Sequence, residues 1–336
     1  MTTWRQPAAS TRRAQADPRC ARPGGLGVTA ASIICLGPTG VGYFGDVTDL
    51  PTQDRGVFAN RHGALLVCDA AIVAYLCAKR FPGQVHLVTN NLGSVVYESQ
   101  LIRTKLGAGI TIYPDSSPFR GAPLDMIFVD RGRGTRSYVT TNYYPSKSHI
   151  LTATRDIYES LSPQLRTVLY VDIEAASDSG KAALEASPLL AMSGASVWNV
   201  GQVTQLSDVE DWLSGTLLPE KAIVQVSLGN SNVTAPELRS TYRQISSAAN
   251  QTLVVTLGSS GAAWANDRDT EMIAVDPVSN AFTLGAGAVL ASSLVMALGS
   301  EESPDVGMVV SDAVVAATRY VRDATLDCDM HGLDYW

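Results

Sequence analysis

The sequence predicts an α/β protein built on one mostly parallel β-sheet with helices on both faces. Two observations support this prediction. From residue 32 onward, short apolar runs rich in β-branched residues alternate with longer segments of helical spacing. Composition agrees, because 336 residues can bury a full core, and 46% hydrophobic with 17% charged residues is typical of a globular protein. Alternation of this kind indicates parallel strands buried between helices.

The elements follow one another in the order that this fold class requires. The expected buried strands are residues 32–36, 85–89, 167–171, 196–200, 222–228 and 253–257. The expected helices are residues 64–80, 94–106, 179–185, 235–250 and 289–298. Two stretches interrupt the alternation: residues 41–60 are polar and rich in Gly and Asp, and residues 110–145 hold strand-like runs at 110–113, 124–129 and 137–139 joined by Pro and Gly turns.

The two ends of the chain differ from the rest. Residues 1–30 carry five arginines among Pro, Gly, Ala and Thr without apolar periodicity, which indicates a disordered tail or an overlong start. A transit peptide is the weaker alternative, because Pro and Gly would break its helix. We therefore expect one α/β domain over residues 31–325 and a short C-terminal tail at 326–336.

Charge and residue usage exclude several classes of function. A net charge of −7 argues against nucleic-acid binding, which needs a basic face, and no apolar run approaches the roughly 18 to 20 residues of a membrane span. The five cysteines form no CxxC pair and are expected to be reduced thiols of a cytoplasmic protein. The four histidines lack metal-ligand spacing, so no zinc site and no other protein-held metal is expected.

Two segments near the C-terminus carry the most specific signal. Gly285, Ala286 and Gly287 lack bulky side chains and precede the apolar run 289–298, so their backbone N–H groups could bind an anion at a helix start. The segment 254–262 is a strand and turn lying some 30 residues upstream. Together they resemble the C-terminal signature of the ribokinase-like (PfkB) family of sugar and nucleoside kinases. The simpler alternative is a Gly/Ala loop before a buried helix.

The resemblance implies a fold, ligands and an assembly. It implies a three-layer sandwich with a mostly parallel sheet and a small β-sheet lid formed by about residues 41–60 and 110–145, and such lids often pair into homodimers. It also implies a sugar or nucleoside-like ligand, with ATP and Mg²⁺ as cofactors. By the same resemblance, the nucleotide-binding candidates are Asn199, Thr256, Gly258, Ser259 and Gly261, and the anion hole is Gly285, Ala286 and Gly287.

A second group of residues is expected to contact the substrate. Asp172 follows an expected strand, at the carboxyl edge where α/β proteins place ligands, and the other members match lid or turn positions of the family. These candidates are Gly42, Asp46, His62, Gly63, Arg136 and Asp172. Residues 40–45 also spell GxGxxG, but no helical pattern and no acid at a strand end follow at the required spacing, so we expect no NAD site.

Three positions depart from the family pattern. Ala288 stands where the family has the Asp that removes the proton from the accepting hydroxyl, Gly42 stands near a usual substrate carboxylate, and Gln202 replaces the Glu of an Asn-x-x-Glu motif that helps to organise magnesium. The possible substitutes for the base are His62, Asp46 and Asp172. The sequence leaves open a divergent phosphotransferase, a repurposed enzyme acting on a nucleoside or sugar phosphate, and a non-catalytic pseudokinase.

Overall fold

A computed structural model describes most of the chain outside the N-terminal 30 residues. The described residues are 31–47, 49–51, 59–93, 96–107, 109–118, 124–130, 135–141, 144–161, 165–174, 194–201, 203–213, 218–229, 231–246, 250–278, 284–300, 304–323 and 334–335. The expected helix at 179–185 and the residue Gln202 lie outside them.

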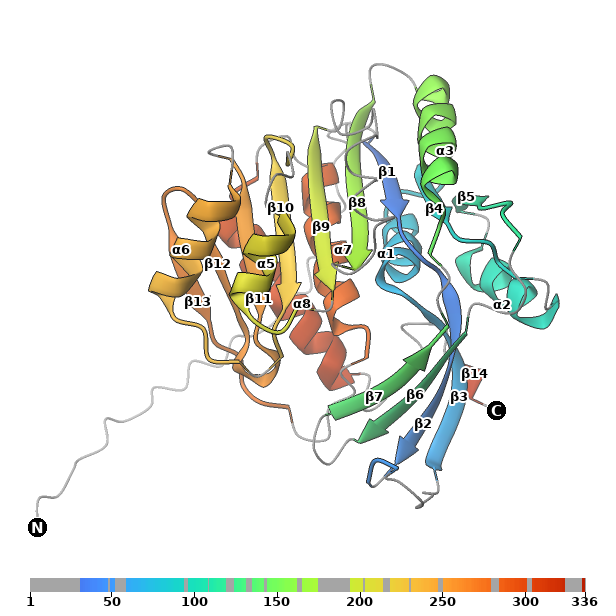
Figure 1. The fold of residues 1–336 in the computed structure, drawn as a ribbon, viewed down its shortest axis with the longest axis horizontal. Coiled ribbons are helices and arrows are strands. Elements are labelled where there is room, and N and C mark those ends of the chain that lie inside the picture. Colours follow the sequence, from blue (N-terminus) through green and yellow to red (C-terminus); the bar gives the residue numbers. More distant parts are fainter. Residues whose placement is uncertain are drawn as a thin grey trace, which may run out of the picture.

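The large sheet contains nine strands in the order β13-β12-β11-β10-β9-β8-β1-β4-β5 (Figure 1). All neighbours from β11 to β5 pair in parallel, and β12 and β13 add an antiparallel edge. The strands are β1 (Ala31–Leu36), β4 (Val85–Thr89), β5 (Ile110–Pro114), β8 (Arg166–Glu174), β9 (Ala195–Gly201), β10 (Ala222–Ser227), β11 (Thr252–Thr256), β12 (Ala262–Ala265) and β13 (Thr270–Ile273).

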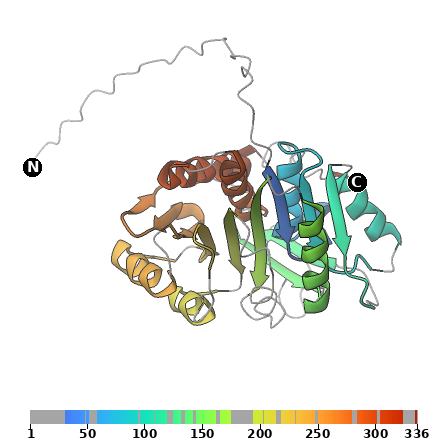
Figure 2. The same cartoon turned by 90° about the horizontal axis from the view of Figure 1, so that it is seen from above.

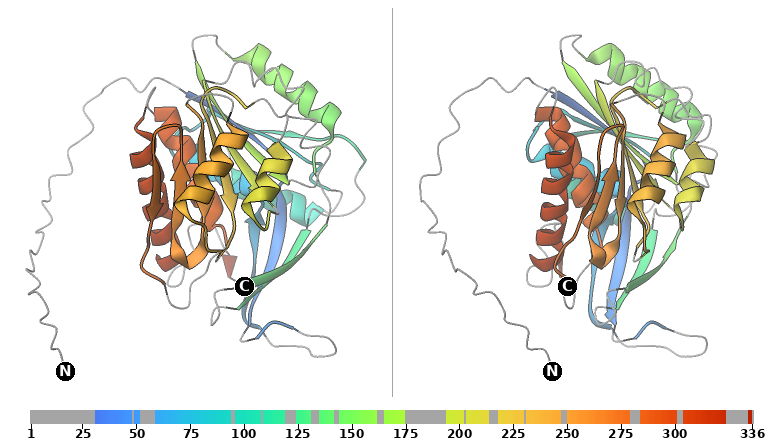
Figure 3. Two further views of the ribbon diagram at one scale, coloured as in Figure 1. Left: turned by 60° about the vertical axis from the view of Figure 1, so that its left-hand side comes forward. Right: turned by 90° about the vertical axis from the view of Figure 1, so that its left-hand side faces the viewer.

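Helices cover both faces of this sheet (Figures 2 and 3). The first face packs on α1 (Asp69–Ala78), α2 (Val96–Leu106), α7 (Ala286–Ser300) and α8 (Val306–Asp323). The second face packs on α3 (Lys147–Ser160), α5 (Leu206–Leu213) and α6 (Ala235–Ile245). Alternate residues of each buried strand enter the two apolar cores, as the period of two requires. The expected α/β fold with a mostly parallel sheet is confirmed.

The smaller sheet has five strands in the order β14-β3-β2-β6-β7. They are β2 (Gly40–Val47), β3 (Ala59–Val67), β6 (Leu124–Asp130), β7 (Thr135–Thr140) and β14 (Asp334–Tyr335). One face of this sheet packs on the helices through a cluster that includes Phe44, Ile127, Val289 and Tyr320. Figure 1 shows that β8 and β9 point toward the smaller sheet, which lies beside their carboxyl ends.

Three expectations need correction. The helix expected at 64–80 begins only at Asp69, because Ala64–Val67 belong to β3, and Cys68 between the two elements has a positive φ of 72°. The run 110–113 forms β5, which pairs with β4 in the large sheet and not with the smaller one. The helix expected to extend to residue 250 ends at Ile245. As expected, Gly40–Gly45 opens no helix; it lies within β2.

Candidate functional site

A row of polar residues crosses the buried first face of the large sheet. Asp172 on β8 lies opposite Asn199 on β9, and Asn199 lies opposite Gln225 on β10. Asn199 and Gln225 are only 9% and 1% exposed. Interior strands of parallel sheets are normally apolar on both faces, and buried polar groups are costly unless they are hydrogen-bonded. The row therefore departs from ordinary core packing and marks a candidate site.

The amide nitrogen of Asn199 joins two carboxylates. It donates to Oδ2 of Asp69 at 3.0 Å and to Oδ1 of Asp172 at 3.1 Å. The backbone N–H of Ala70 donates to the other oxygen of Asp172 at 3.3 Å. Asp69 is the first residue of α1, where the positive end of the helix favours a negative charge. Two acids that are 103 positions apart in the sequence therefore share one amide donor.

The start of α7 lies against this cluster. Gly285 has a positive φ of 84°, and the N–H of Val289 donates to the Gly285 carbonyl at 3.0 Å. The N–H groups of Ala286, Gly287 and Ala288 precede that bond, and the first N–H groups of a helix lack carbonyl partners within the helix. A carbon atom added to Gly287 would lie 3.7 Å from both Asp69 Oδ2 and the Gln225 amide nitrogen. The first turn of α7 therefore lies beside the Asp69 carboxylate and the Gln225 amide.

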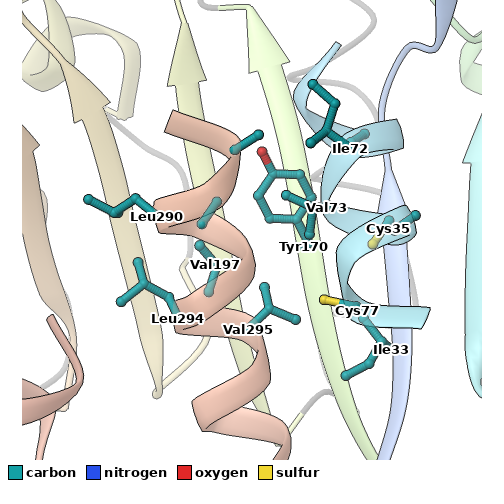
Figure 4. Packing of buried hydrophobic residues seen from close by; sticks show 14 of the residues in the cluster. Ile33, Cys35, Ile72, Val73, Cys77, Tyr170, Val197, Leu290, Leu294 and Val295 are labelled. Carbon is teal, nitrogen blue, oxygen red and sulfur yellow. The ribbon is translucent and has the colours of Figure 1, made fainter. Parts of the chain in front are cut away.

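Gln225 and Tyr170 extend the cluster into the core. The Gln225 amide nitrogen donates to the Gly287 carbonyl at 3.2 Å, whereas its oxygen has no hydrogen-bond partner among the described residues. Tyr170 is fully buried between α1 and α7 (Figure 4). Its hydroxyl makes no hydrogen bond within the usual limits of distance and angle among the described residues, although the nearby Asn199 side chain acts to lower its pKa. Burial raises the pKa of Tyr170 well above its usual value, and the charges of Asp172 and Asp69 raise it further.

Close packing fixes Asp172 from the side of β1. A carbon atom added to Gly37, directly after β1, would lie 2.7 Å from Cβ of Asp172 and 2.8 Å from Cβ of Ala70. Such distances are shorter than van der Waals contact. Glycine at this position lets β1 end against the carboxylate cluster.

The structure brings some of the expected site residues together and separates others. Asp172 and Asn199 meet at the carboxyl edge of β8–β10. Gly287 lies beside Asp69 and Gln225 there, and Gly285 and Ala286 directly precede it in the chain. Thr256, Gly258, Ser259 and Gly261 lie at the end of β11 and in the turn that follows it. Gly42 and Asp46 on β2, His62 and Gly63 on β3 and Arg136 on β7 belong to the smaller sheet. Ala288 is fully buried in the apolar core of the first face.

Asp69, Gln225 and Tyr170 were missed from the sequence. Asp69 had a signal, because it is the only charged residue between Arg61 and Lys79, where it interrupts an apolar run. Gln225 similarly interrupts the apolar strand 222–226. Tyr170 looked like an ordinary core residue.

Among the described residues, no group of three or more His, Cys, Asp or Glu could hold a metal ion. The Asn199 amide nitrogen, a hydrogen-bond donor, bridges the carboxylates of Asp69 and Asp172. No helix within the described ranges is long and apolar enough to cross a membrane.

The architecture is the ribokinase-like fold, as comparison with solved structures shows. No protein-family model and no curated protein matches the sequence. The chain is similar to ribokinase from Giardia lamblia, with a TM-score of 0.67 and 17% identity over 87% of this chain and 93% of that chain. It is also similar to ribokinase from Cryptococcus neoformans var. grubii serotype A in complex with ADP, with a TM-score of 0.60 and 17% identity over 88% and 94% of the two chains. Phosphofructokinase-2 from Escherichia coli gives a TM-score of 0.62 and 12% identity over 88% and 93%. At these identities the likeness establishes the fold alone.

Proposed function

We propose that the protein binds a sugar or nucleoside-like small molecule at the carboxyl edge of β8–β10. The observation that carries this proposal is the buried polar row of Asp172, Asn199 and Gln225 beside Asp69 and the start of α7. Carboxylates and side-chain amides are suited to ligand hydroxyl groups because they supply acceptors and donors in fixed directions. The smaller sheet would cover the ligand, with Gly42, Asp46, His62, Gly63 and Arg136 as its contributors.

We further propose that the reaction is transfer of a phosphoryl group from ATP to a ligand hydroxyl. Kinases share this fold, and the free N–H groups expected at the start of α7 suit a phosphate. Gly285, Ala286 and Gly287 would form the anion hole. The ATP would lie toward the end of β11, near Thr256, Gly258, Ser259 and Gly261. Magnesium would enter on the ATP phosphates, since Mg²⁺ commonly keeps its waters and binds through substrate phosphates.

Ala288 makes this an unusual phosphotransferase. The family's proton-accepting Asp would stand at this position, and Ala288 is fully buried among apolar residues of α1 and α7. Loss of a general base typically lowers the rate about 10²- to 10⁴-fold. We therefore expect either slow transfer or a carboxylate supplied from elsewhere in the site.

A second candidate is a protein that binds the ligand or a sugar phosphate without ATP-dependent transfer. The complete burial of Ala288 favours this second candidate. The start of α7 would still offer N–H groups to an anion, but no side chain at position 288 could act as the base. Such a protein would be a repurposed enzyme or a pseudokinase, and it would be stabilised by its ligand without forming ADP.

The smaller sheet also suggests an assembly. Tyr43, Met126 and Val139 lie opposite one another on β2, β6 and β7, and they are 37%, 51% and 67% exposed. We propose that this apolar row pairs with a second copy of the chain to give a homodimer. We also place the protein in the cytoplasm, in keeping with the buried thiols of Cys35 and Cys77, which form no disulfide.

The deciding experiment measures phosphoryl transfer from γ-labelled ATP with Mg²⁺ to a panel of sugars and nucleosides. The same panel, extended to the corresponding phosphates, is screened for thermal stabilisation. Asn199→Ala should abolish ligand stabilisation, because it removes the amide that bridges the carboxylates of Asp69 and Asp172. The control Asn250→Ala changes an exposed amide that bonds Glu220. Binding without ADP formation would favour the second candidate. Absence of both binding and transfer across the panel would refute the proposed function.

A further inference from the structure

We infer that Asp69 is the carboxylate that accepts the proton of the ligand hydroxyl, in place of the side chain that Ala288 lacks. This inference rests on the proposed phosphoryl transfer. The supporting observation is that Asp69 lies next to the start of α7. The first turn of α7 itself contains no acidic residue.

The geometry places the Asp69 carboxylate at the anion site. Oδ2 of Asp69 lies 3.7 Å from the point where a side chain on Gly287 would begin, so it faces the loop at the start of α7 directly. Helices α1 and α7 pack against each other, and Asp69 and Gly287 stand in their first turns. A hydroxyl bound beside Gly287 would therefore lie near both the Asp69 carboxylate and the first N–H groups of α7.

Asp172 lies one step further from the start of α7 than Asp69 and acts through its neighbours. Asp172 receives a donor on each oxygen, from Asn199 and from the Ala70 N–H, and its Cβ is enclosed by Gly37. These contacts make Asp172 a positioning residue, which orients Asn199 and the first turn of α1. Asn199 in turn holds Oδ2 of Asp69 at 3.0 Å.

The backbone before Asp69 gives an independent indication. Cys68 is the only non-glycine among the described residues with a positive φ, at 72° with ψ at 134°. Such conformations cost free energy and concentrate at functional sites. Here the strained residue Cys68 joins β3 to α1, and its backbone conformation sets the orientation of Asp69 at the start of the helix.

His62 and Asp46 are worse placed for this role. Asp46 lies opposite Arg61 in the smaller sheet, and His62 lies opposite Gly45. Both therefore belong to the sheet that would cover the ligand, whereas Asp69 belongs to the helix that packs on α7.

The proposed step balances in atoms and charge. The ligand hydroxyl gives its proton to the Asp69 carboxylate while its oxygen forms a bond to the γ-phosphorus of ATP. The bond between the γ-phosphorus and the β–γ bridging oxygen breaks, and ADP leaves with that electron pair. The proton on Asp69 is released to solvent after the phosphorylated product leaves.

The test compares three carboxylate-to-amide variants in the transfer assay across pH. Asp69→Asn should lower kcat about 10²- to 10⁴-fold and remove the acid limb of the kcat profile, because no carboxylate then needs to ionise. Asp172→Asn should lower kcat less and keep the acid limb, as expected of a positioning residue. Asp312→Asn removes an exposed carboxylate of α8 and should leave kcat and the profile unchanged. Asp69→Glu keeps the negative charge and should retain the acid limb at a reduced rate. It serves as a second variant at this position in case Asp69→Asn does not fold.

The outcomes separate this inference from the function on which it rests. If wild type transfers phosphate and Asp69→Asn stays within about threefold of it with an intact acid limb, Asp69 is not the base although the proposed reaction stands. If the ligand panel stabilises wild type but no transfer occurs, the inference and the reaction both fail while the binding site stands. If nothing in the panel binds or reacts, the proposed function fails as well.

Discussion

Two fully buried tyrosines should respond in opposite directions to the same substitution. Tyr170 and Tyr320 are both 0% exposed, but only the Tyr320 hydroxyl donates a hydrogen bond that can be identified, to the Leu284 carbonyl at 2.7 Å. The Tyr170 hydroxyl makes no hydrogen bond within the usual limits of distance and angle among the described residues, and only the Asn199 side chain lies near enough to act on its pKa by hydrogen bonding. Replacing either residue with Phe retains the ring and removes only the hydroxyl.

The expected magnitudes follow from these partners. Leaving a buried polar group without a hydrogen bond costs about 1–3 kcal/mol. Tyr170→Phe should therefore raise the free energy of unfolding by about 1 kcal/mol or more. Tyr320→Phe should lower it by about 1–2 kcal/mol, because it removes one hydrogen bond and leaves the Leu284 carbonyl without that donor.

Urea unfolding at pH 7 measures both values, provided that the slope with denaturant is the same in the three proteins. A loss of stability in Tyr170→Phe comparable to that in Tyr320→Phe would refute the reasoning. It would mean that the Tyr170 hydroxyl is satisfied, by Asn199 or by a buried water, and that the site is less strained than its contacts indicate.

Three further predictions concern packing and pH. Gly37→Ala should destabilise the fold by about 1–3 kcal/mol in urea unfolding, since its new carbon would overlap Asp172; an unchanged midpoint would contradict this. Gly261→Ala should cost at least as much, because φ is 100° there and the carbon would meet the Ile273 carbonyl; a soluble variant of wild-type midpoint would refute it. Asp115 has a pKa of about 2, because hydrogen bonds from two serines outweigh the upward effect of burial. Its stabilisation of about 2 kcal/mol is therefore present above pH 4 and lost as pH falls toward 2, and Asp115→Asn should remove that dependence in unfolding measured across pH.

The sequence predicted the large sheet well because its strands are short apolar runs bounded by turns. The six expected strands all form and pair in one sheet. Local pattern could not decide two other points. Ala64–Val67 and the body of the helix after it are equally apolar and are separated only by Cys68 and Asp69, so hydrophobicity alone did not mark the change from strand to helix at Cys68. The run at 110–113 is equally compatible with either sheet, and only its pairing with β4 places it.

The candidate site was predicted in part. Asp172 and Asn199 were expected from their position at strand ends, and Gly285–Gly287 from their composition. Asp69 was missed because it was placed inside an expected helix, where a lone acid reads as solvent-exposed. Its neighbour in space, Asn199, lies 130 positions away in the sequence, and contacts across that separation follow from strand order and not from periodicity.

The position of β1 has a consequence for how the protein is made. β1 is the first strand described, yet it lies inside the sheet, with β4 on one edge and β8 on the other. During synthesis, β1, β4 and β5 could pair early, while the other edge of β1 would remain open until β8 has left the ribosome. Helix α7 is synthesised later still. The Asn199 amide and the Asp69 carboxylate would therefore have no Gly287 beside them until α7 has left the ribosome. A nascent chain arrested before α7 would thus leave uncovered the part of the first face on which α7 packs, and it would lack Gly287 beside Asp69.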